Sequence, residues 1–582
     1  MVFTVNINKS SRNTSSGNNG LLKEVNGVNG MPISVAPGFP DLEDQFNQMG
    51  ITHIRLHDCF GVGDIDNGFN ANHSNIDQLL VTVPFDQQDK AKEFLADYAN
   101  KRTIFPYAAV GMRNNDLKQA LRSPNYRITD DAIRRTMINN ASVNPGNLQR
   151  EVMFRIGRTL DGGYEVPENF DIYAFLVSRL VMRYSINYKG IGLPRKVTYW
   201  EIWNEPDLTF FWNNNNPQIY YEFYAKIANA IKAVDPTAKV GGPAVAYGYN
   251  PGGAYIDGLL NYCQTTNTPI DFFSWHYYNS SPQSIIDAGN YIQDTLNKHG
   301  FSNLESFCTE WNSTPTGTVN SFTKLQSAQN AAFLTSILTC MQYTKIDKAY
   351  YYRGDGAAFG LFNDQTNPKR PQNKNFCTYA AQGFNLFTRM FETPYILTQD
   401  NDFSTGLTTL VAENEVGNKI NILASNFEMD SNFVEPAFPP NGYSLYSQYY
   451  LDSNRTTNQL DDDWSKAHWF GGVDPRTIMY NNEVPQKELV PQLPISENLP
   501  QKTIDYEQSR MGLTVNIANI PENYNDYKIT AYRIKEDGRL DRMTPEQVTT
   551  SIDSALIDRV LTITDVGATS STVTLYTVEL IN

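Results

Sequence analysis

The sequence predicts an α/β protein in which a (β/α)8 TIM barrel is followed by an accessory C-terminal β-sandwich domain. Two patterns in the 582 residues indicate this architecture. Between residues 31 and 354, short apolar segments alternate with amphipathic helical segments, which is the order that builds a parallel barrel. After about residue 380 the helical period fades, and short alternating segments separated by turn residues take its place, as in a sandwich.

Eight segments are candidates for the barrel strands. Each is a run of six to eight mostly apolar residues, and amphipathic stretches such as NFDIYAFLVSRLVMRYSI separate them. In chain order the candidate strands are residues 31–37, 52–58, 152–158, 197–204, 239–244, 271–277, 306–311 and 348–354.

The strand pattern predicts three regions. Residues 1–30 hold a strand and a loop that we expect to join the β-domain, residues 31–380 form the barrel, and residues 381–582 form the sandwich. The barrel carries a long insertion at 59–151, and the sandwich carries an irregular insertion at 429–508. The first insertion follows a strand end, so we expect it on the face where barrels place their sites, as a lid or a substrate wall.

Composition narrows the class of ligand. Lys and Arg total 47 against 62 for Asp and Glu, a formal net charge of −15, which argues against a nucleic-acid binder. No run of 18 apolar residues exists, so no membrane-spanning helix is expected. Aromatic residues make up 12% and charged residues only 19%, a balance compatible with neutral polar ligands such as sugars.

Cysteine spacing and the N-terminus bear on the compartment. The five cysteines are widely spaced and form no CxxC pair, so we expect buried thiols rather than a zinc site or a disulfide framework. The N-terminal residues lack the apolar segment of a signal peptide. This is expected of a cytoplasmic chain, or of a secreted or periplasmic chain whose signal has been removed.

Two glutamates at predicted strand ends are the sharpest feature. Glu205 lies in Trp-Asn-Glu-Pro after the fourth strand, and Glu310 lies in Cys-Thr-Glu-Trp on the seventh. These strands lie nearly opposite each other across the barrel mouth, so a sugar ring would fit between the two carboxylates. Retaining glycoside hydrolysis needs such a pair, one as nucleophile and one as acid and then base. Asn204 beside Glu205 can donate to a sugar hydroxyl.

Neighbouring residues would have to tune this pair. The acid must stay protonated, which burial and a nearby negative charge favour, and the nucleophile needs donors, for which Arg55 and His276 lie near strand ends. Both could instead be packing or ion-pair residues. The Glu201 side chain should point to the same side of its strand as that of Glu205 but lie deeper in the barrel. We expect it to be a buried partner of an arginine rather than a catalyst. The aromatic residues expected to flank the site and stack on a sugar are Trp203, Trp275, Trp311 and Tyr277.

At these residues the chain resembles the clan A glycoside hydrolases, and most closely glycoside hydrolase family 39, which includes β-xylosidases and α-L-iduronidases. The resemblance rests on ordered segments that cover most of residues 25–365. These segments are VNGV, IRLHDCFGVGDID, VMFRIGR, YWEIWNEPD, KVGGPAV, DFFSWHYY, FCTEWN and FGLF. YWEIWNEPD with KVGGPAV downstream is the most specific combination.

The resemblance implies a retaining double displacement with Glu205 as acid/base and Glu310 as nucleophile. It implies that Asn204 contacts the 2-hydroxyl of the sugar and that His57 contacts the glycone. It implies no metal and no organic cofactor. The substrate-binding residues that we predict are His57, Asn204, His276, Tyr277, Arg55 and Trp311.

The sequence therefore predicts a retaining glycosidase that acts on a glycan or oligosaccharide and is nominally β-xylosidase-like. We expect no nucleic-acid or membrane partner. We also expect that the chain can self-associate through the β-domain. Two alternatives stay open. One is another glycone or an endo mode, such as an α-L-arabinofuranosidase, an α-L-iduronidase-like enzyme or an exopolysaccharide endo-hydrolase. The other is a non-catalytic carbohydrate-binding protein on a hydrolase fold, which would be expected to have lost one glutamate.

Overall fold

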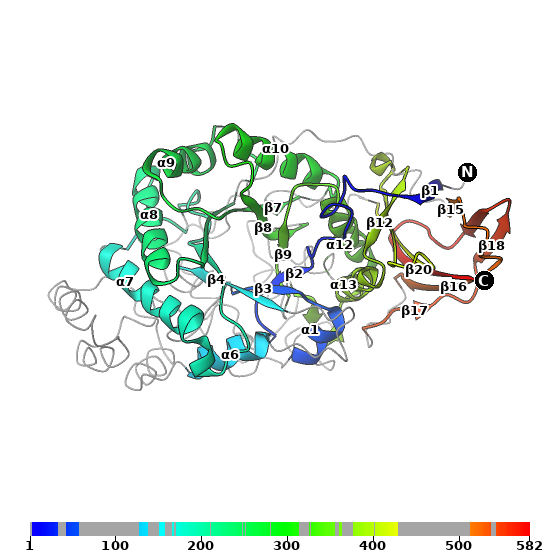
Figure 1. Ribbon diagram of the computed structural model, residues 1–582, viewed down its shortest axis with the longest axis horizontal. Helices are drawn as coiled ribbons and strands as arrows, with labels where there is room; N and C mark the ends of the chain where they lie inside the picture. Colours follow the sequence, from blue (N-terminus) through cyan, green and yellow to red (C-terminus); the bar gives the residue numbers. More distant parts are fainter. Residues whose placement is uncertain are drawn as a thin grey trace, which may run out of the picture.

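The structure is a computed structural model, and its described residues fall into several ranges (Figure 1). They are residues 3–32, 42–56, 127–137, 150–157, 166–167, 170–209, 211–246, 248–250, 252–279, 281–313, 325, 327–354, 360–363, 376–400, 402–428, 512–536 and 543–582. The predictions for His57, for most of the insertion at 59–151 and for the whole insertion at 429–508 lie outside these residues.

Eight parallel strands close into a barrel, which confirms the predicted fold class (Figure 1). Each strand pairs with the next in chain order, and the last pairs with the first. The strands are β2 (Gly27–Asn29), β3 (His53–Leu56), β4 (Glu151–Ile156), β5 (Tyr199–Ile202), β6 (Lys239–Val245), β7 (Phe272–Tyr278), β8 (Glu305–Asn312) and β9 (Lys348–Tyr351).

The first barrel strand differs from the prediction. It is the three-residue β2, whereas the sequence favoured residues 31–37. Val28 pairs with Ile54 on one side and Tyr351 on the other, and Gly30 then takes a left-handed φ of 89° that ends the strand. The apolar run that looked like a strand begins only after this turn.

Helices cover the outside of the barrel (Figure 1). They include α1 (Glu43–Met49), α6 (Arg127–Met137), α7 (Phe170–Val181), α8 (Pro217–Val234), α9 (Leu259–Thr266), α10 (Ser284–Lys298), α12 (Ala328–Met341) and α13 (Tyr379–Arg389). The start of α8 shows why these sequences are helical: Pro217 occupies the first turn, and the side chain of Asn216 accepts from the backbone N–H of Gln218. Of the helices in the described ranges, none is long and apolar enough to cross a membrane.

Large side chains fill the lower half of the barrel interior. This cluster contains Met153, Tyr199, Phe272, Phe307 and Tyr350, which come from five different strands. Tyr199 and Phe272 are the first residues of their strands, so the cluster lies toward the N-terminal ends. The interior is therefore a packed floor, and polar side chains have room to gather only above it, at the C-terminal ends of the strands.

The β-domain is one ten-stranded sheet with the order β17-β16-β20-β14-β13-β12-β1-β15-β19-β18. Its strands are β1 (Phe3–Arg12), β12 (Tyr395–Gln399), β13 (Leu407–Glu413), β14 (Lys419–Asn426), β15 (Leu513–Ala518), β16 (Asp526–Ile534), β17 (Glu546–Gln547), β18 (Ile552–Ile557), β19 (Val560–Asp565) and β20 (Thr572–Ile581). The N-terminal β1 pairs with β12 and β15 and so lies inside this sheet (Figure 1).

The sheet curls so that its two halves share one apolar core. Val5, Val515 and Ile563 from one half belong to the same buried cluster as Ile422 and Val578 from the other. The two layers predicted as a sandwich are thus joined through the pairing of β1 with β12 into a single continuous sheet.

Helix α12 connects the barrel to the β-domain. Nearly all of its residues are buried, and it contacts α10 and α13 of the barrel as well as β13, β14 and β20 of the sheet. Ser425 Oγ donates to Thr335 Oγ1 at 2.5 Å, and the rings of Phe333 and Phe427 meet edge to face at 5.7 Å. This helix therefore belongs to the cores of both parts.

We expect Phe333→Ala to lower the free energy of unfolding by about 3–5 kcal/mol, because it empties a fully buried ring position. Barrel and β-domain should still unfold in one calorimetric transition, since α12 ties them together. Val416→Ala, at a position 76% exposed on the β-domain, is the control and should change little. If Phe333→Ala unfolded in two transitions, with only that of the β-domain moved to lower temperature, this shared core would be contradicted.

Candidate active site

Glu205 lies on a tight turn after β5. Trp203 and Glu205 have φ values of 75° and 45°, which non-glycine residues adopt only where the surroundings enforce it. Backbone hydrogen bonds supply this restraint: Trp203 N donates to Ile156 O at 2.8 Å, and Glu205 N donates to Ala244 O at 2.9 Å. The turn is thus fixed to the strands on both sides, and the Glu205 side chain is held at the barrel mouth.

Glu310 lies on β8 opposite His276 of β7. Its Oε1 accepts from Arg55 Nη1 at 2.6 Å, and its Oε2 accepts from the Tyr278 hydroxyl at 2.7 Å. Burial, together with the nearby Glu310 charge, raises the pKa of Tyr278 well above its usual value, so this hydroxyl stays protonated and donates. Each carboxylate oxygen of Glu310 therefore has a donor, which favours the ionised form.

Arg55 on β3 is fully buried beneath the two glutamates. It donates from Nε to Glu201 Oε2 (2.5 Å), from Nη1 to Glu310 Oε1 (2.6 Å) and Asn29 Oδ1 (3.1 Å), and from Nη2 to Asn204 Oδ1 (2.7 Å). Burial disfavours the charged guanidinium, but the carboxylates of Glu201 and Glu310 outweigh this cost, so the pKa of Arg55 is raised. Arg55 stays charged and orders the floor of the site.

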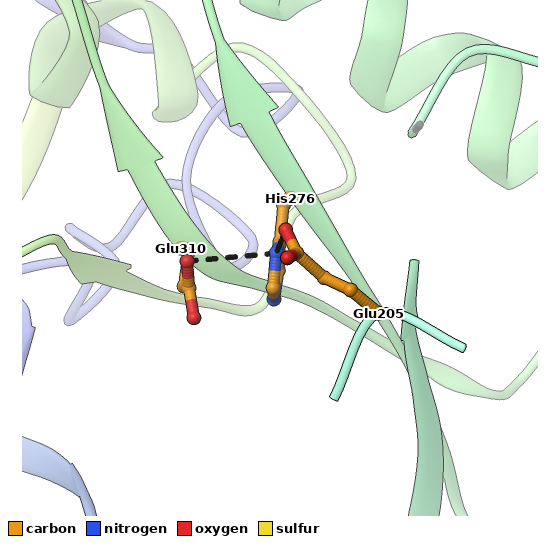
Figure 2. Close-up of side chains that lie close together, drawn as sticks. All are labelled: Glu205, His276 and Glu310. Atoms are coloured by element: carbon orange, nitrogen blue, oxygen red, sulfur yellow. Dashed lines mark hydrogen bonds and ion pairs between the residues drawn. The ribbon is translucent and has the colours of Figure 1, made fainter. Parts of the chain in front are cut away.

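His276 lies between the two glutamates (Figure 2). Its Nδ1 is 2.7 Å from Glu205 Oε1 and 3.6 Å from Glu310 Oε2. One ligand atom from each of the three residues lies within 4.8 Å of the others. Retaining glycosidases hold their two carboxyl groups about 5–5.5 Å apart, whereas inverting enzymes need about 6.5–9.5 Å. The pair is therefore close enough for a retaining mechanism.

The two carboxyl groups have different environments. Burial raises the pKa of Glu205 well above its usual value, the charges of Glu310 and Asp207 raise it further, and Arg55 opposes them. Glu310 instead bonds directly to Arg55. Burial and like charge thus favour the neutral form of Glu205, whereas the ion pair with Arg55 favours the ionised form of Glu310.

The same three residues, Glu205, His276 and Glu310, form the group within the described part of the chain whose donor atoms could hold a metal ion. Their present bonding suits proton transfer better than ligation. His276 Nδ1 already shares a hydrogen bond with Glu205, and the cation Arg55 already neutralises Glu310.

The sequence that carries this site is similar to known glycoside hydrolases. Residues 158–358 match the model of glycosyl hydrolases family 39. This part of the chain is therefore similar to glycoside hydrolase family 39. The matched region contains both glutamates, whereas Arg55 and Asn29 come from the chain before it.

Three proteins show how far the similarity extends. A β-xylosidase from Geobacillus stearothermophilus is 27% identical over 285 residues, which are 42% of this chain and 52% of that protein. A β-xylosidase from Caldicellulosiruptor saccharolyticus is 36% identical over 118 residues, 20% of this chain and 22% of that protein. This chain thus spans about half the length of the first relative. The crystal structure of a glucosidase from Croceicoccus marinus has a TM-score of 0.64 at 20% identity over 100% of both chains, which shows the shared fold.

The structure brings together most of the predicted family 39 site. Glu205, Glu310, Asn204, Arg55 and His276 lie in one network of hydrogen bonds. The deeper position of Glu201 and its pairing with an arginine are also as predicted. His57 lies outside the described residues.

Tyr277 and Trp311 are corrections to the predicted substrate-binding set. Side chains alternate along a strand, so when His276 and Glu310 point inward the next residues point to the helices. The Tyr277 hydroxyl donates to Ser281 O, and Trp311 packs edge to face on Tyr351 with none of its surface exposed. Trp203 and Trp275, expected to stack on a sugar, are likewise buried in the core around the barrel.

The sequence prediction missed Asn29 and Tyr278. Asn29 accepts from Arg55 and donates through Nδ2 to the Thr309 and Tyr350 carbonyls, so it holds Arg55 against β8 and β9. The two-residue period of FFSWHYY was a usable signal for Tyr278, because it places this residue on the same side as His276. Asn29 was missed because the first strand was placed too late in the chain.

We expect Arg55→Met to destabilise the fold by about 3–5 kcal/mol near pH 7 in urea unfolding, because Glu201 and Glu310 would be left buried without a cation. Arg12→Met is the control, since Glu413 keeps its ion pair with Lys9, and it should cost at most about 1 kcal/mol. Equal losses in the two variants would contradict the role of Arg55.

Proposed function

We propose that this protein is a retaining glycoside hydrolase that cleaves O-glycosidic bonds of a neutral glycan or oligosaccharide, with β-xylosidase-like release of a terminal sugar as its nominal activity. One observation carries the proposal: a buried Glu205, whose pKa is raised by burial, and an ion-paired Glu310 offer oxygens within 4.8 Å of each other at the C-terminal ends of barrel strands. The family 39 match and the two relatives named β-xylosidases support it.

In the first step a carboxylate oxygen of Glu310 attacks the anomeric carbon of the sugar. The bond between that carbon and the leaving oxygen breaks, and its electron pair leaves with the oxygen. Glu205 gives its proton to this oxygen, so the aglycone departs as a neutral alcohol. The sugar remains as an ester of Glu310.

In the second step Glu205, now a carboxylate, takes a proton from water. The water oxygen attacks the anomeric carbon, the ester bond breaks, and its electron pair returns to Glu310. Both glutamates regain their starting charge, and the sugar leaves with the anomeric configuration that it had in the substrate.

Other residues would position the sugar and the pair. Asn204 accepts from Arg55 through Oδ1, so its amide nitrogen is the group directed to the 2-hydroxyl of the sugar. Tyr278 and Arg55 hold Glu310, and His276 holds Glu205. Contact of His57 with the glycone stays a prediction from the sequence resemblance.

A panel of 4-nitrophenyl glycosides tests the proposal. We expect the β-D-xyloside to be hydrolysed with the highest kcat/KM among β-xyloside, α-L-arabinofuranoside, β-glucoside and α-L-iduronide. A different best substrate would overturn the nominal glycone but keep the mechanism. Binding of sugars with no hydrolysis anywhere in the panel would overturn the mechanism in favour of the non-catalytic alternative.

Products from xylo-oligosaccharides separate the exo mode from the endo mode, since the proposed activity releases only monosaccharide at early times.

Self-association through the β-domain stays a prediction, and the molar mass in solution of the whole chain checks it.

A further inference from the structure

A third buried carboxylate, Glu201, belongs to the site but takes part in neither step above. It lies on β5 below Asn204 and has no exposed surface. Its Oε2 accepts from Arg55 Nε at 2.5 Å, while Arg55 Nη1 donates to Glu310 at 2.6 Å. One guanidinium therefore lies between two carboxylates, of which only Glu310 changes its charge during the reaction.

The charge balance around Arg55 differs between the two states of the enzyme. In the free enzyme one cation faces two anions, Glu201 and Glu310. When Glu310 becomes an ester it is neutral, and Glu201 is then the remaining anion bonded to Arg55. A buried arginine without a counter-charge is costly, so Glu201 supplies this charge when Glu310 cannot.

From this arrangement, and resting on the proposed function, we infer that Glu201 is a positioning residue that keeps Arg55 charge-balanced while Glu310 is esterified. It thereby sets the relative rates of the two steps. Without the Glu201 charge, Arg55 would attract Glu310 alone. That would stabilise the free carboxylate, slow its attack on the sugar, and make it a better leaving group when the ester is hydrolysed.

Glu201→Gln is the variant of choice, because glutamine has the same shape and keeps an oxygen that can accept from Arg55 Nε. A 2-deoxy-2-fluoro aryl glycoside of the best sugar from the panel measures each step separately. The fluorine slows both steps, so the rate of inactivation reports ester formation and the rate of reactivation after removal of the reagent reports ester hydrolysis.

We expect Glu201→Gln to inactivate at least about tenfold more slowly than the wild type and to reactivate at least about threefold faster. Glu201→Asp keeps the charge and should restore the inactivation rate in part. The matched control is Glu305→Gln, because Glu305 lies roughly 16 Å from Glu310 along β8 and pairs with Lys239 and Tyr199. Both of its rates should stay within about twofold of the wild type.

A fall of both rates in Glu201→Gln by the same factor would show a merely structural role and overturn the inference, as would unchanged rates. If Glu201→Gln does not fold, Glu201→Asp decides: its carboxylate is set back from Arg55 by one methylene, so slower inactivation should come with reactivation at least as fast as in the wild type, and a fall of both rates by the same factor would contradict a role that depends on charge. Failure of the proposed function looks different, because the wild-type protein would then form no covalent adduct on Glu310 with the reagent.

Discussion

Replacing Glu310 with glutamine or alanine is expected to lower kcat by about 10⁴-fold or more on every glycoside that the protein hydrolyses. Glu310 would form the bond to the sugar, and of the two paired glutamates it is the one bonded directly to the cation Arg55. Steady-state kinetics across the panel measure the effect. Near wild-type activity on any of these substrates would mean that Glu310 is not the nucleophile.

Two further measurements separate loss of chemistry from loss of folding. Glu305→Gln removes another charge from β8 and should retain kcat, because Glu305 lies at the opposite end of the strand. In Glu310→Ala, added azide should occupy the vacated space and attack the sugar from the same side as the missing carboxylate. The expected product is a glycosyl azide with inverted configuration, which only a folded site would form.

Replacing Glu205 with alanine is expected to give a loss that depends on the leaving group. Substrates with poorly acidic aglycones need the proton from Glu205, and kcat/KM on them should fall by about 10²–10⁴-fold. Activated aryl glycosides leave without that proton, so their ester formation should be nearly unchanged. Equal losses on both kinds of substrate would contradict the role of acid.

The pH profile gives a second test of Glu205. Burial and the Glu310 and Asp207 charges raise its pKa, so the protonated acid persists toward neutral pH and is lost as the pH rises through this raised value. The basic limb of kcat/KM should therefore report Glu205 in the wild type. It should disappear in Glu205→Ala with an activated substrate, and its persistence would show that another group sets this limb.

Much of the fold could be predicted because it follows local rules. Seven of the eight candidate barrel strands overlap observed strands, since each is an apolar run bounded by helical or turn sequence. The first strand was misplaced because β2 has only three residues, too few for a periodic signal, and tertiary pairing with Ile54 and Tyr351 defines it.

The candidate site likewise has a part that could be predicted from the sequence and a part that could not. Glu205 and Glu310 could be found from motifs at strand ends, where barrel geometry dictates the direction of the side chain. The four bonds of Arg55 could not, because they join residues between 26 and 255 positions apart in the chain. Tyr277 was a wrong prediction because the two-residue period of β7, which puts Tyr278 on the same face as His276, was not applied there.

The central claim is that the Glu205 and Glu310 pair hydrolyses glycosides by double displacement. The configuration of the first-formed sugar tests it most directly. Proton NMR of an aryl β-glycoside digest, recorded before mutarotation, should show the β-anomer appearing first and the α-anomer only later. Initial appearance of the α-anomer would mean that water attacks the sugar directly, and would contradict the account.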